Sequence, residues 1–383
     1  MTCRTRGRRT LSVVTATVLL TAACGTDSKS SPGDRANLEG PSALDDPRDP
    51  AFPDPLIDLD ALVAGGPPPD GIPPIDDPDF EPASDVDWLA DDEPVLSLTV
   101  GDETRAYPLQ VMTWHEIVND TVDGVPVAVT YCPLCNSGVA FERETGGRLL
   151  DFGTSGLLYI DNLVMYDRQT ESLWPQLTGE ASVGVLTGTQ LTSIPMGVVG
   201  WKRFREAHPD AAVLTRDTGH HRDYGRNPYA GYDEPDGSLL VPVDPDPRLP
   251  VKERVLGITV GKESVALRRS SLAEEGVAEV RVGGRDLVVW HVAGQASALD
   301  SSRLSEGREV GSVGVFRPEL DGRALTFSRR DGRILDDRTG STWSVTGEAL
   351  AGPLAGERLT PQVHLDTFWF AWIGFRPDTR LAG

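Results

Sequence analysis

Two cysteines separated by two residues are the side chains of this sequence with the clearest chemical potential. Cys132 and Cys135 lie in the stretch TYCPLCNSGVAF, residues 130–141. In such a pair the pKa of the first thiol can fall well below its free value of about 8.5, and the second thiol can then resolve a mixed disulfide. The same residues can instead supply part of a metal site or close a structural disulfide. Three kinds of function are therefore open.

The first 24 residues predict export. A basic stretch is followed by an apolar run that is too short for a spanning helix, and then by small residues that end at Cys24. The segment LTAAC at 20–24 resembles a bacterial lipobox, in which the signal is cut before the cysteine and the cysteine is lipidated. We expect a lipoprotein signal peptide at residues 1–24, lipidation of Cys24 and an extracytoplasmic protein anchored to the cell membrane. An ordinary signal peptide with an incidental cysteine is the alternative.

Export limits the thiols that remain. The chain has four cysteines, of which Cys3 would leave with the signal peptide and Cys24 would be blocked by lipid. Cys132 and Cys135 would then be the only free thiols, in an oxidising compartment where a pair can close a disulfide.

Charge and composition restrict the partners. The net charge of −22 argues against nucleic acid and against charge-driven binding to anionic lipid. Membrane attachment should therefore come from the lipid on Cys24. The hydrophobic content of 39% is enough to build packed cores in a chain of 383 residues.

Residues 25–92 are expected to form a disordered tether. They are dense in Pro and Asp and show no sustained apolar period, so they cannot bury enough surface to offset the entropy lost on ordering. Short apolar pieces such as Leu56-Ile57 and Leu59 are the exceptions that could dock on the folded part.

The remainder of the sequence repeats itself. VLSLTVGDETRAYPL from Val95 matches VLGITVGKESVALRR from Val255, an offset of 255 − 95 = 160. DRQTESLWPQLTGEA from Asp167 matches DRTGSTWSVTGEA from Asp337, in the same order along the chain. We therefore predict an internal duplication. Its parts are a first repeat at 93–217, a connector at 218–252 and a second repeat at 253–383.

Each repeat is expected to consist mainly of short strands. The segments are rich in β-branched and aromatic residues and are punctuated by Gly, Asp-Gly and Pro. Helices are expected only at residues 110–120 and 197–210. The predicted fold class is a β-rich α+β fold, made of two tandem pseudo-symmetric repeats of mostly antiparallel strands.

The duplication provides an internal control for the cysteines. Where the first repeat has YCPLCN at 131–136, the second has HVAGQA at 291–296, without either cysteine. A disulfide needed by the shared fold would be expected in both repeats. Other residues do recur and favour a structural network: Asp167, Arg168 and Glu180 match Asp337, Arg338 and Glu348.

Four longer blocks resemble a known bacterial family. They are WHEIVNDTVDGVPVAVTYCPLCNSGVAFER, LVMYDRQTESLWPQLTGEA, RDYGRNPYAGY and GERLTPQVHLDTFWFAW. The chain is similar, from about residue 96 on, to domain-of-unknown-function family 3179. The resemblance implies export. Because some related sequences are described as selenoproteins, it also implies redox work at the Cys-x-x-Cys position, without naming an activity.

The interpretation we prefer is a thiol-disulfide redox site. A predicted strand runs into the cysteine pair and another follows, which places both sulfurs on one side of a tight turn. Cys132 or Cys135 would attack and the other would resolve, with no required cofactor and with an unknown envelope protein or thiol as partner. Thiol exchange requires reachable sulfurs, so burial in packed hydrocarbon would contradict it. Candidate lining residues are Asn136, Ser155, Gly156, Tyr224 and Arg226.

Two alternatives use the same cysteines. A copper or zinc carrier would need further ligands, such as His115 with Met112 or Met165 as a weak ligand. A lone histidine beside Trp114 is, however, more often a packing residue. The other alternative is a non-catalytic envelope interaction module with a structural disulfide.

Overall fold

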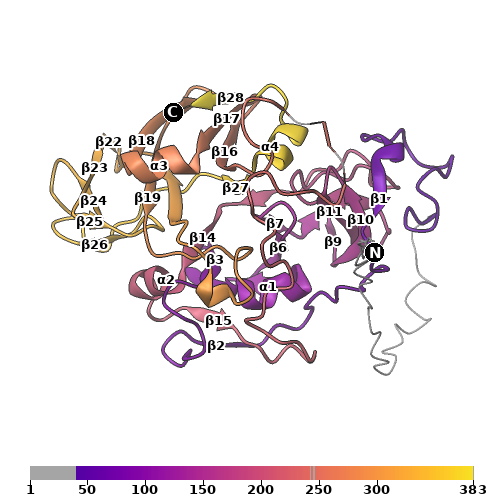
Figure 1. The fold of residues 1–383 in the computed structure, drawn as a ribbon, viewed down its shortest axis with the longest axis horizontal. Helices are drawn as coiled ribbons and strands as arrows, with labels where there is room; N and C mark the ends of the chain where they lie inside the picture. Colours follow the sequence, from indigo (N-terminus) through magenta and orange to yellow (C-terminus); the bar gives the residue numbers. More distant parts are fainter. Residues whose placement is uncertain (1–39, 242, 245, 383) are drawn as a thin grey trace, which may run out of the picture. The chain divides into compact units, whose positions relative to one another are not determined.

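The computed structural model describes residues 40–241, 243–244 and 246–382. The predicted signal peptide, Cys24 and residues 25–39 lie outside the described residues. The prediction of a β-rich α+β fold with mostly antiparallel strands is confirmed (Figure 1). Within the described part, no helix combines the length and the apolar character that crossing a membrane requires.

Residues 94–214 form three sheets and a short hairpin. The sheets have the orders β14-β3-β4-β15-β2, β13-β7-β6-β5 and β1-β10-β11-β12, and β8 pairs with β9. The elements are β3 (Pro94–Val100), β4 (Glu103–Pro108), α1 (Leu109–His115), β5 (Ile117–Val122), β6 (Val125–Cys132), β7 (Ser137–Glu142), β8 (Glu144–Thr145), β9 (Arg148–Leu149), β10 (Phe152–Tyr159), β11 (Asn162–Asp167), β12 (Leu173–Pro175), β13 (Ser193–Ile194), β14 (Met196–Gly200), α2 (Trp201–Ala207) and β15 (Ala212–Leu214), with β1 (Leu62–Ala64) and β2 (Phe80–Pro82) added from the N-terminal side.

Residues 254–382 form a second set of sheets. Their orders are β27-β16-β17-β28, β18-β19-β20 and β23-β24-β25-β26, and β21 pairs with β22. The elements are β16 (Arg254–Val260), β17 (Glu263–Arg268), α3 (Arg269–Glu275), β18 (Val277–Val282), β19 (Arg285–Val292), the 3-10 helix η3 (Leu304–Glu306), β20 (Ser312–Phe316), β21 (Glu319–Leu320), β22 (Arg323–Ala324), β23 (Phe327–Arg330), β24 (Arg333–Asp336), β25 (Thr342–Trp343), β26 (Ala349–Ala351), β27 (Leu365–Phe368), α4 (Trp369–Phe375) and β28 (Arg380–Ala382).

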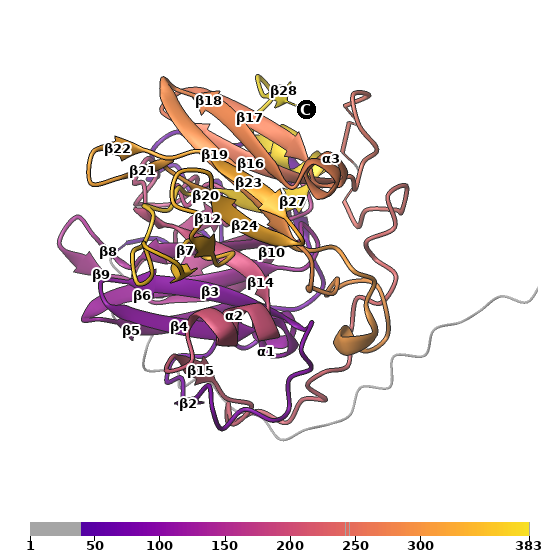
Figure 2. The ribbon, with the colours of Figure 1, turned by 90° about the vertical axis from the view of Figure 1, so that its left-hand side faces the viewer.

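The same strand order occurs in both sets. β14-β3-β4-β15 in the first corresponds to β27-β16-β17-β28 in the second. In each case the last strand runs parallel to its neighbour, β15 to β4 and β28 to β17, whereas the other pairs are antiparallel. Figure 2 shows the second set, in orange and yellow, above the purple strands of the first.

The two sets exchange contacts in a reciprocal way. β14 of the first set packs beside β20 of the second, and β27 packs beside β7. The N–H of Trp201 donates to the Glu93 carbonyl, and the N–H of Trp369 donates likewise to the Glu253 carbonyl, both at 2.8 Å. The first residue of α2 and of α4 is therefore hydrogen-bonded within its own set. The strand before each helix, β14 or β27, lies against the other set.

The structure corrects the register of one sequence match. The Asp167 carboxylate accepts hydrogen bonds from Thr170 and from the indole of Trp174. The carboxylate with the same pattern in the second set belongs to Asp336, which accepts from Thr339 and Trp343. Asp167 therefore corresponds to Asp336 rather than to Asp337, so the sequence match was shifted by one residue. The sequence alone cannot distinguish the two adjacent aspartates.

Residues 40–92 correct the expected tether, because they pack onto the first set of sheets. The 3-10 helix η2 (Leu59–Ala61) leads into β1, which pairs with β10, and β2 pairs with β15. Ile75 is buried and forms a parallel bridge with Val118. Backbone pairing at sheet edges supplies the contacts that the sparse apolar residues of this segment cannot supply.

The observed helices are shorter than predicted. The helix expected at 110–120 ends at His115, because Glu116 takes a positive φ of 59° and the β-branched residues that follow form β5. The helix expected at 197–210 begins only at Trp201, since residues 196–200 form strand β14.

Candidate functional site

The cysteines lie in a tight turn, as the sequence predicts. Cys132 ends β6 and pairs with Ser137 at the start of β7, so only four residues connect the strands. The N–H of Asn136 donates to the Pro133 carbonyl at 3.1 Å, and Asn136 has a positive φ of 51°. This short connection brings the two sulfurs to the same side of the hairpin.

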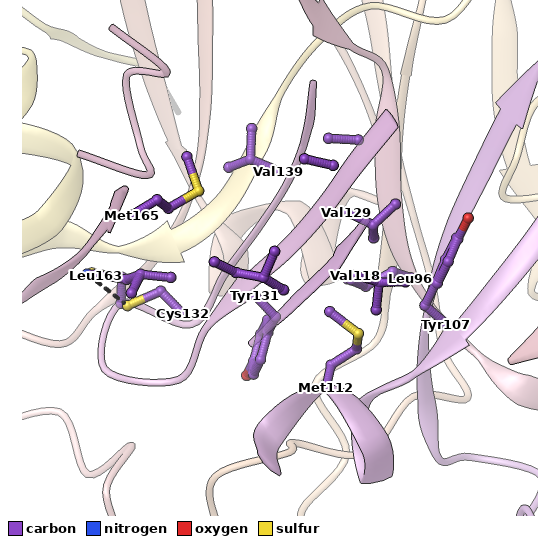
Figure 3. Packing of buried hydrophobic residues seen from close by; sticks show 14 of the residues in the cluster. Leu96, Tyr107, Met112, Val118, Val129, Tyr131, Cys132, Val139, Leu163 and Met165 are labelled. Carbon is purple, nitrogen blue, oxygen red and sulfur yellow. Dashed lines mark hydrogen bonds between the residues drawn. The ribbon is translucent and has the colours of Figure 1, made fainter. Parts of the chain in front are cut away.

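Both sulfurs face the turn between β10 and β11. The Cys132 Sγ accepts a hydrogen bond from the N–H of Leu163 at 3.4 Å, drawn in Figure 3. The Cys135 Sγ accepts from the Asn162 amide and donates to the Asp161 carbonyl, each at 3.4 Å. Burial first, and then the hydrogen-bonded Cys132 thiol, raise the pKa of the Cys135 thiol well above its usual value.

The thiols are free and enclosed. Cys132 is 1% exposed and Cys135 is fully buried, and both belong to the largest apolar core. Polar side chains adjoin them, however. The Asn162 amide and the Ser137 hydroxyl meet at the buried amide of Gln176. The sulfurs are therefore out of solvent's reach in this conformation, which counts against thiol exchange unless the site opens, and buried polar groups of Asp161 and Asn162 adjoin Cys135 on one side.

The connector at 218–252 contacts this side of the cysteine pair. The Tyr232 hydroxyl donates to the Asp161 carboxylate at 2.9 Å, and the N–H groups of Leu240 and Val241 donate to the same carboxylate. Burial raises the pKa of Asp161, although these donors act in the opposite direction. One carboxylate beside Cys135 thus holds three groups of the connector.

The second set of sheets holds both the connector and the cysteine turn. The N–H of Gly231 donates to the Asp300 carbonyl in the long loop between β19 and β20, which occupies residues 293–311. The N–H of Phe368 and the hydroxyl of Thr367, both in β27, donate to the Cys135 carbonyl at 3.0 and 2.8 Å. The site therefore exists only where the two sets meet.

The turn that faces the sulfurs has a strained backbone. Ile160 and Asp161 both have a φ of 53°, and Tyr159 pairs with Asn162 across them. Two left-handed residues suit a tight hairpin, but a β-branched residue is disfavoured there. The hairpin turn between β23 and β24 uses the favoured pair Asp331-Gly332. Of these two hairpin turns, only the one beside the cysteines places a β-branched residue in the left-handed region.

Glu116 is a second unusual residue near the pair. Its side chain is buried, and its hydrogen bond from the Tyr229 hydroxyl is long, at 3.4 Å. Burial raises the pKa of Glu116 to about 8, and Tyr229 lowers it only partly. The N–H of Tyr131, the residue before Cys132, donates to the Glu116 carbonyl at 2.8 Å.

The candidate lining residues separate in the structure. Asn136 lies in the cysteine turn, where its side chain accepts from the Tyr131 hydroxyl. Ser155 donates to the Val164 carbonyl within a bulge of β10, and Gly156 approaches residue 67, so both serve the local backbone. Tyr224 contacts His115 and Thr218. Arg226 is exposed and bridges to the 293–311 loop.

His115 does not join the cysteines. It is fully buried, and its ring nitrogens lie 2.7 Å from the Pro73 carbonyl and the Tyr224 hydroxyl. Burial lowers the pKa of His115 to about 4, so the ring is neutral at ordinary pH. Met112 and Met165 pack within the apolar core (Figure 3). Across the described ranges, no three His, Cys, Asp or Glu side chains gather as a metal site would require.

Sequence reasoning missed several residues of the site. They come from the β10–β11 turn, from the cap of α1, from the residue after β12 and from the connector, and they are Glu116, Asp161, Asn162, Gln176, Tyr229 and Tyr232. The aromatic run RDYGRNPYAGY in the connector was the only local signal. The other residues could not be linked to the cysteines before the fold was known.

Comparison with known proteins identifies a family. Residues 69–379 match the family described as protein of unknown function, DUF3179. The chain belongs to this family. The resemblance seen in the sequence is thereby confirmed, and the match begins inside the segment expected to be a tether. Neither curated proteins nor solved structures gave a match.

Replacing Glu116 tests its burial through stability. The folded-state pKa of about 8 lies above the ordinary 4.5, so between these pH values the unfolded chain releases a proton that the folded protein keeps. The contribution of Glu116 to stability is full below the lower value and is lost as the pH rises to the higher one. Glu116→Gln should match the wild type near pH 4. At pH 8 its free energy of unfolding should be higher by a few kcal/mol, at about 1.4 kcal/mol per pKa unit.

Urea unfolding across this pH range provides the measurement. Glu279→Gln, which changes an exposed carboxyl on β18, serves as the control and should keep the wild-type pH dependence. Equal pH dependence in Glu116→Gln and the wild type would show that the carboxyl is ionised when folded.

A second substitution tests the connector as the cover of the thiols. Tyr232→Phe removes the hydroxyl that donates to Asp161, a bond to a carboxylate that contributes about 1.5 kcal/mol. We expect iodoacetamide to alkylate the native thiols about tenfold faster in this variant. Tyr224→Phe, on the same connector but bonded to His115, should leave the rate unchanged. Equal rates in both variants would mean that another opening exposes the cysteines.

Proposed function

We propose that the protein is an exported lipoprotein whose Cys132 and Cys135 exchange between thiol and disulfide forms with an envelope partner. The observation that carries this proposal is a pair of free thiols held in a four-residue turn against a strained hairpin. Export and the lipid on Cys24 enter from the sequence, since residues 1–39 lie outside the described part.

The contacts favour different roles for the two sulfurs. The Cys132 Sγ accepts a backbone N–H and is the less buried of the two sulfurs, at 1% exposure. Burial and the neighbouring thiol raise the pKa of Cys135, so its thiol keeps its proton. Cys132 is therefore the attacking sulfur in this proposal, and Cys135 is the resolving sulfur.

The proposed reaction transfers two electrons to a partner disulfide. The Cys132 thiolate attacks one partner sulfur, which forms a mixed disulfide and releases the other partner sulfur as a thiolate. Cys135 then loses its proton and attacks the Cys132 sulfur. The products are the Cys132–Cys135 disulfide and a reduced partner that has gained two electrons and the proton of Cys135, with its second sulfur released as a thiolate.

Burial sets a condition on this function. A partner disulfide cannot reach sulfurs that are 1% and 0% exposed, so the connector has to move before exchange. The connector is held beside Cys135 in part by donors to one buried carboxylate, Asp161, whose ionised form burial disfavours. Such a cover suits a partner-specific exchange rather than an open, general reductase.

We also propose that the two sets of sheets arose by duplication of one unit. The equal strand orders, the paired Trp201 and Trp369 contacts, and the matched Asp167 and Asp336 networks support two copies of one unit. On this view the cysteine turn is an addition to the first copy. The second copy instead has the long 293–311 loop, which holds the connector.

The alternatives receive less support. A copper or zinc carrier needs a third ligand beside the cysteines, and no His, Asp or Glu of the described residues joins them in such a group. A purely structural role for the cysteines would account for their burial. It would not account for Ile160, a β-branched residue whose unfavourable backbone conformation lies in the turn that faces the thiols.

Single substitutions test the assigned roles. Cys135→Ser should trap a mixed disulfide between Cys132 and a small disulfide such as oxidised glutathione, whereas Cys132→Ser should react at least tenfold more slowly. Mass spectrometry of the adducts provides the measurement. Equal trapping by both variants would contradict the assigned roles. The absence of any adduct in either variant, with the thiols reactive after unfolding, would contradict exchange itself.

A further inference from the structure

A pocket lies between α3, the end of β19 and the connector. Its volume is about 310 Å³, at the lower end of the range for sites that bind small molecules. The buried side chains of Lys252, Arg269 and His291 line this pocket, together with Arg254, whose side chain is 12% exposed. Lysine and arginine therefore bring three largely buried positive charges to one pocket, in a chain whose net charge is −22.

The basic side chains of this pocket have too few acceptors. The guanidinium groups of Arg254 and Arg269 share one carboxylate, that of Asp366. Among the described residues, Nε and Nη1 of Arg254, Nε of Arg269 and Nδ1 of His291 have no hydrogen-bond partner. The Oδ1 atom of Asp366 also lacks a donor, but it is a single acceptor against four donor positions. Burial of charged donors without acceptors is costly.

The carboxylates that line the pocket have partners of their own. Asp233 pairs with Arg308 at 2.9 Å, and Glu253 pairs with Arg268 at 3.1 Å. The Glu309 carboxylate accepts from backbone N–H groups of its own loop. These contacts leave a single carboxylate for the buried guanidinium pair.

The fold does not require charge at these positions. Arg269 has a structural task, because it donates to the carbonyls of Val310 and Gly311 at 3.0 and 2.6 Å. Arg254, in contrast, donates to Asp366 alone among the described residues. A buried ion pair can often be replaced by apolar residues without loss of stability. In the first set, the positions that match Arg254, Arg269 and Asp366 hold the buried residues Pro94, Leu109 and Val198.

We propose that this pocket binds a small molecule through a carboxylate group, which supplies the acceptor that Arg254 and Arg269 lack. Guanidinium groups bind carboxylates through short, charge-assisted hydrogen bonds. A phosphate carries a second negative charge, which the carboxylates of Asp233 and Glu309 in the same pocket disfavour. The inference is independent of thiol exchange, since no step of it involves the cysteines.

Saturation-transfer NMR with propionate as the probe tests this inference. The dissociation constant is measured at pH 7 and constant ionic strength, for the wild type and for Arg254→Gln, which removes the charge and keeps a polar side chain. We expect Arg254→Gln to weaken propionate binding about tenfold. Arg281→Gln, at an exposed site on β18, is the control and should bind propionate as the wild type does. Inorganic phosphate should bind the wild type about tenfold more weakly than propionate.

Ala273→Leu tests the pocket without changing a charge. Ala273 lies on α3 and lines the pocket, so a larger side chain takes up part of its volume, and leucine is a good helix former. We expect this variant to unfold in urea as the wild type does and to lose propionate binding. Binding that is absent from the wild type, or equal in the wild type, Arg254→Gln and Ala273→Leu, would overturn the inference. Phosphate binding as tight as propionate binding would overturn the assignment to carboxylates.

Discussion

The connection of β6 to β7 by four residues is the constraint on which the site depends. So short a turn brings Cys132 and Cys135 together and leaves the Cys135 carbonyl pointing away from its own sheet. Two donors of β27, the Phe368 N–H and the Thr367 hydroxyl, satisfy that buried carbonyl. Docking of the second set of sheets therefore satisfies a buried polar group of the cysteine turn.

Several residues of the first set have left-handed backbone conformations where the second set has glycine, and Glu171, matched by Gly340, is one of them away from the cysteine turn. Ile160 stands in a left-handed turn where the second set has Asp331-Gly332, and Glu116 stands where the second set has Gly276. Strain of this kind persists only where surrounding structure enforces it, and it is typical of functional sites. The second set shows that the fold can be built without it. The strain is thus a property of the cysteine-bearing set rather than of the architecture.

The sequence was sufficient for the strands and for the tight turn, because β-branched segments, Gly and Pro carry local information. It was insufficient for the segment at 40–92, where pairing of β1 and β2 with distant strands replaces a hydrophobic pattern. It could not link Tyr232 to Asp161 beside the cysteines, since these two residues lie 71 positions apart along the chain. The choice between Asp336 and Asp337 likewise needed the hydrogen bond of Trp343.

The central claim is that Cys132 and Cys135 form a working redox couple rather than a permanent bridge or an inert pair. The reduction potential of this couple, measured by equilibration with glutathione buffers, tests it most directly. A working couple should titrate above about −300 mV, within the range of exchange proteins. A potential below about −300 mV would mark a structural disulfide and would contradict thiol exchange at this site.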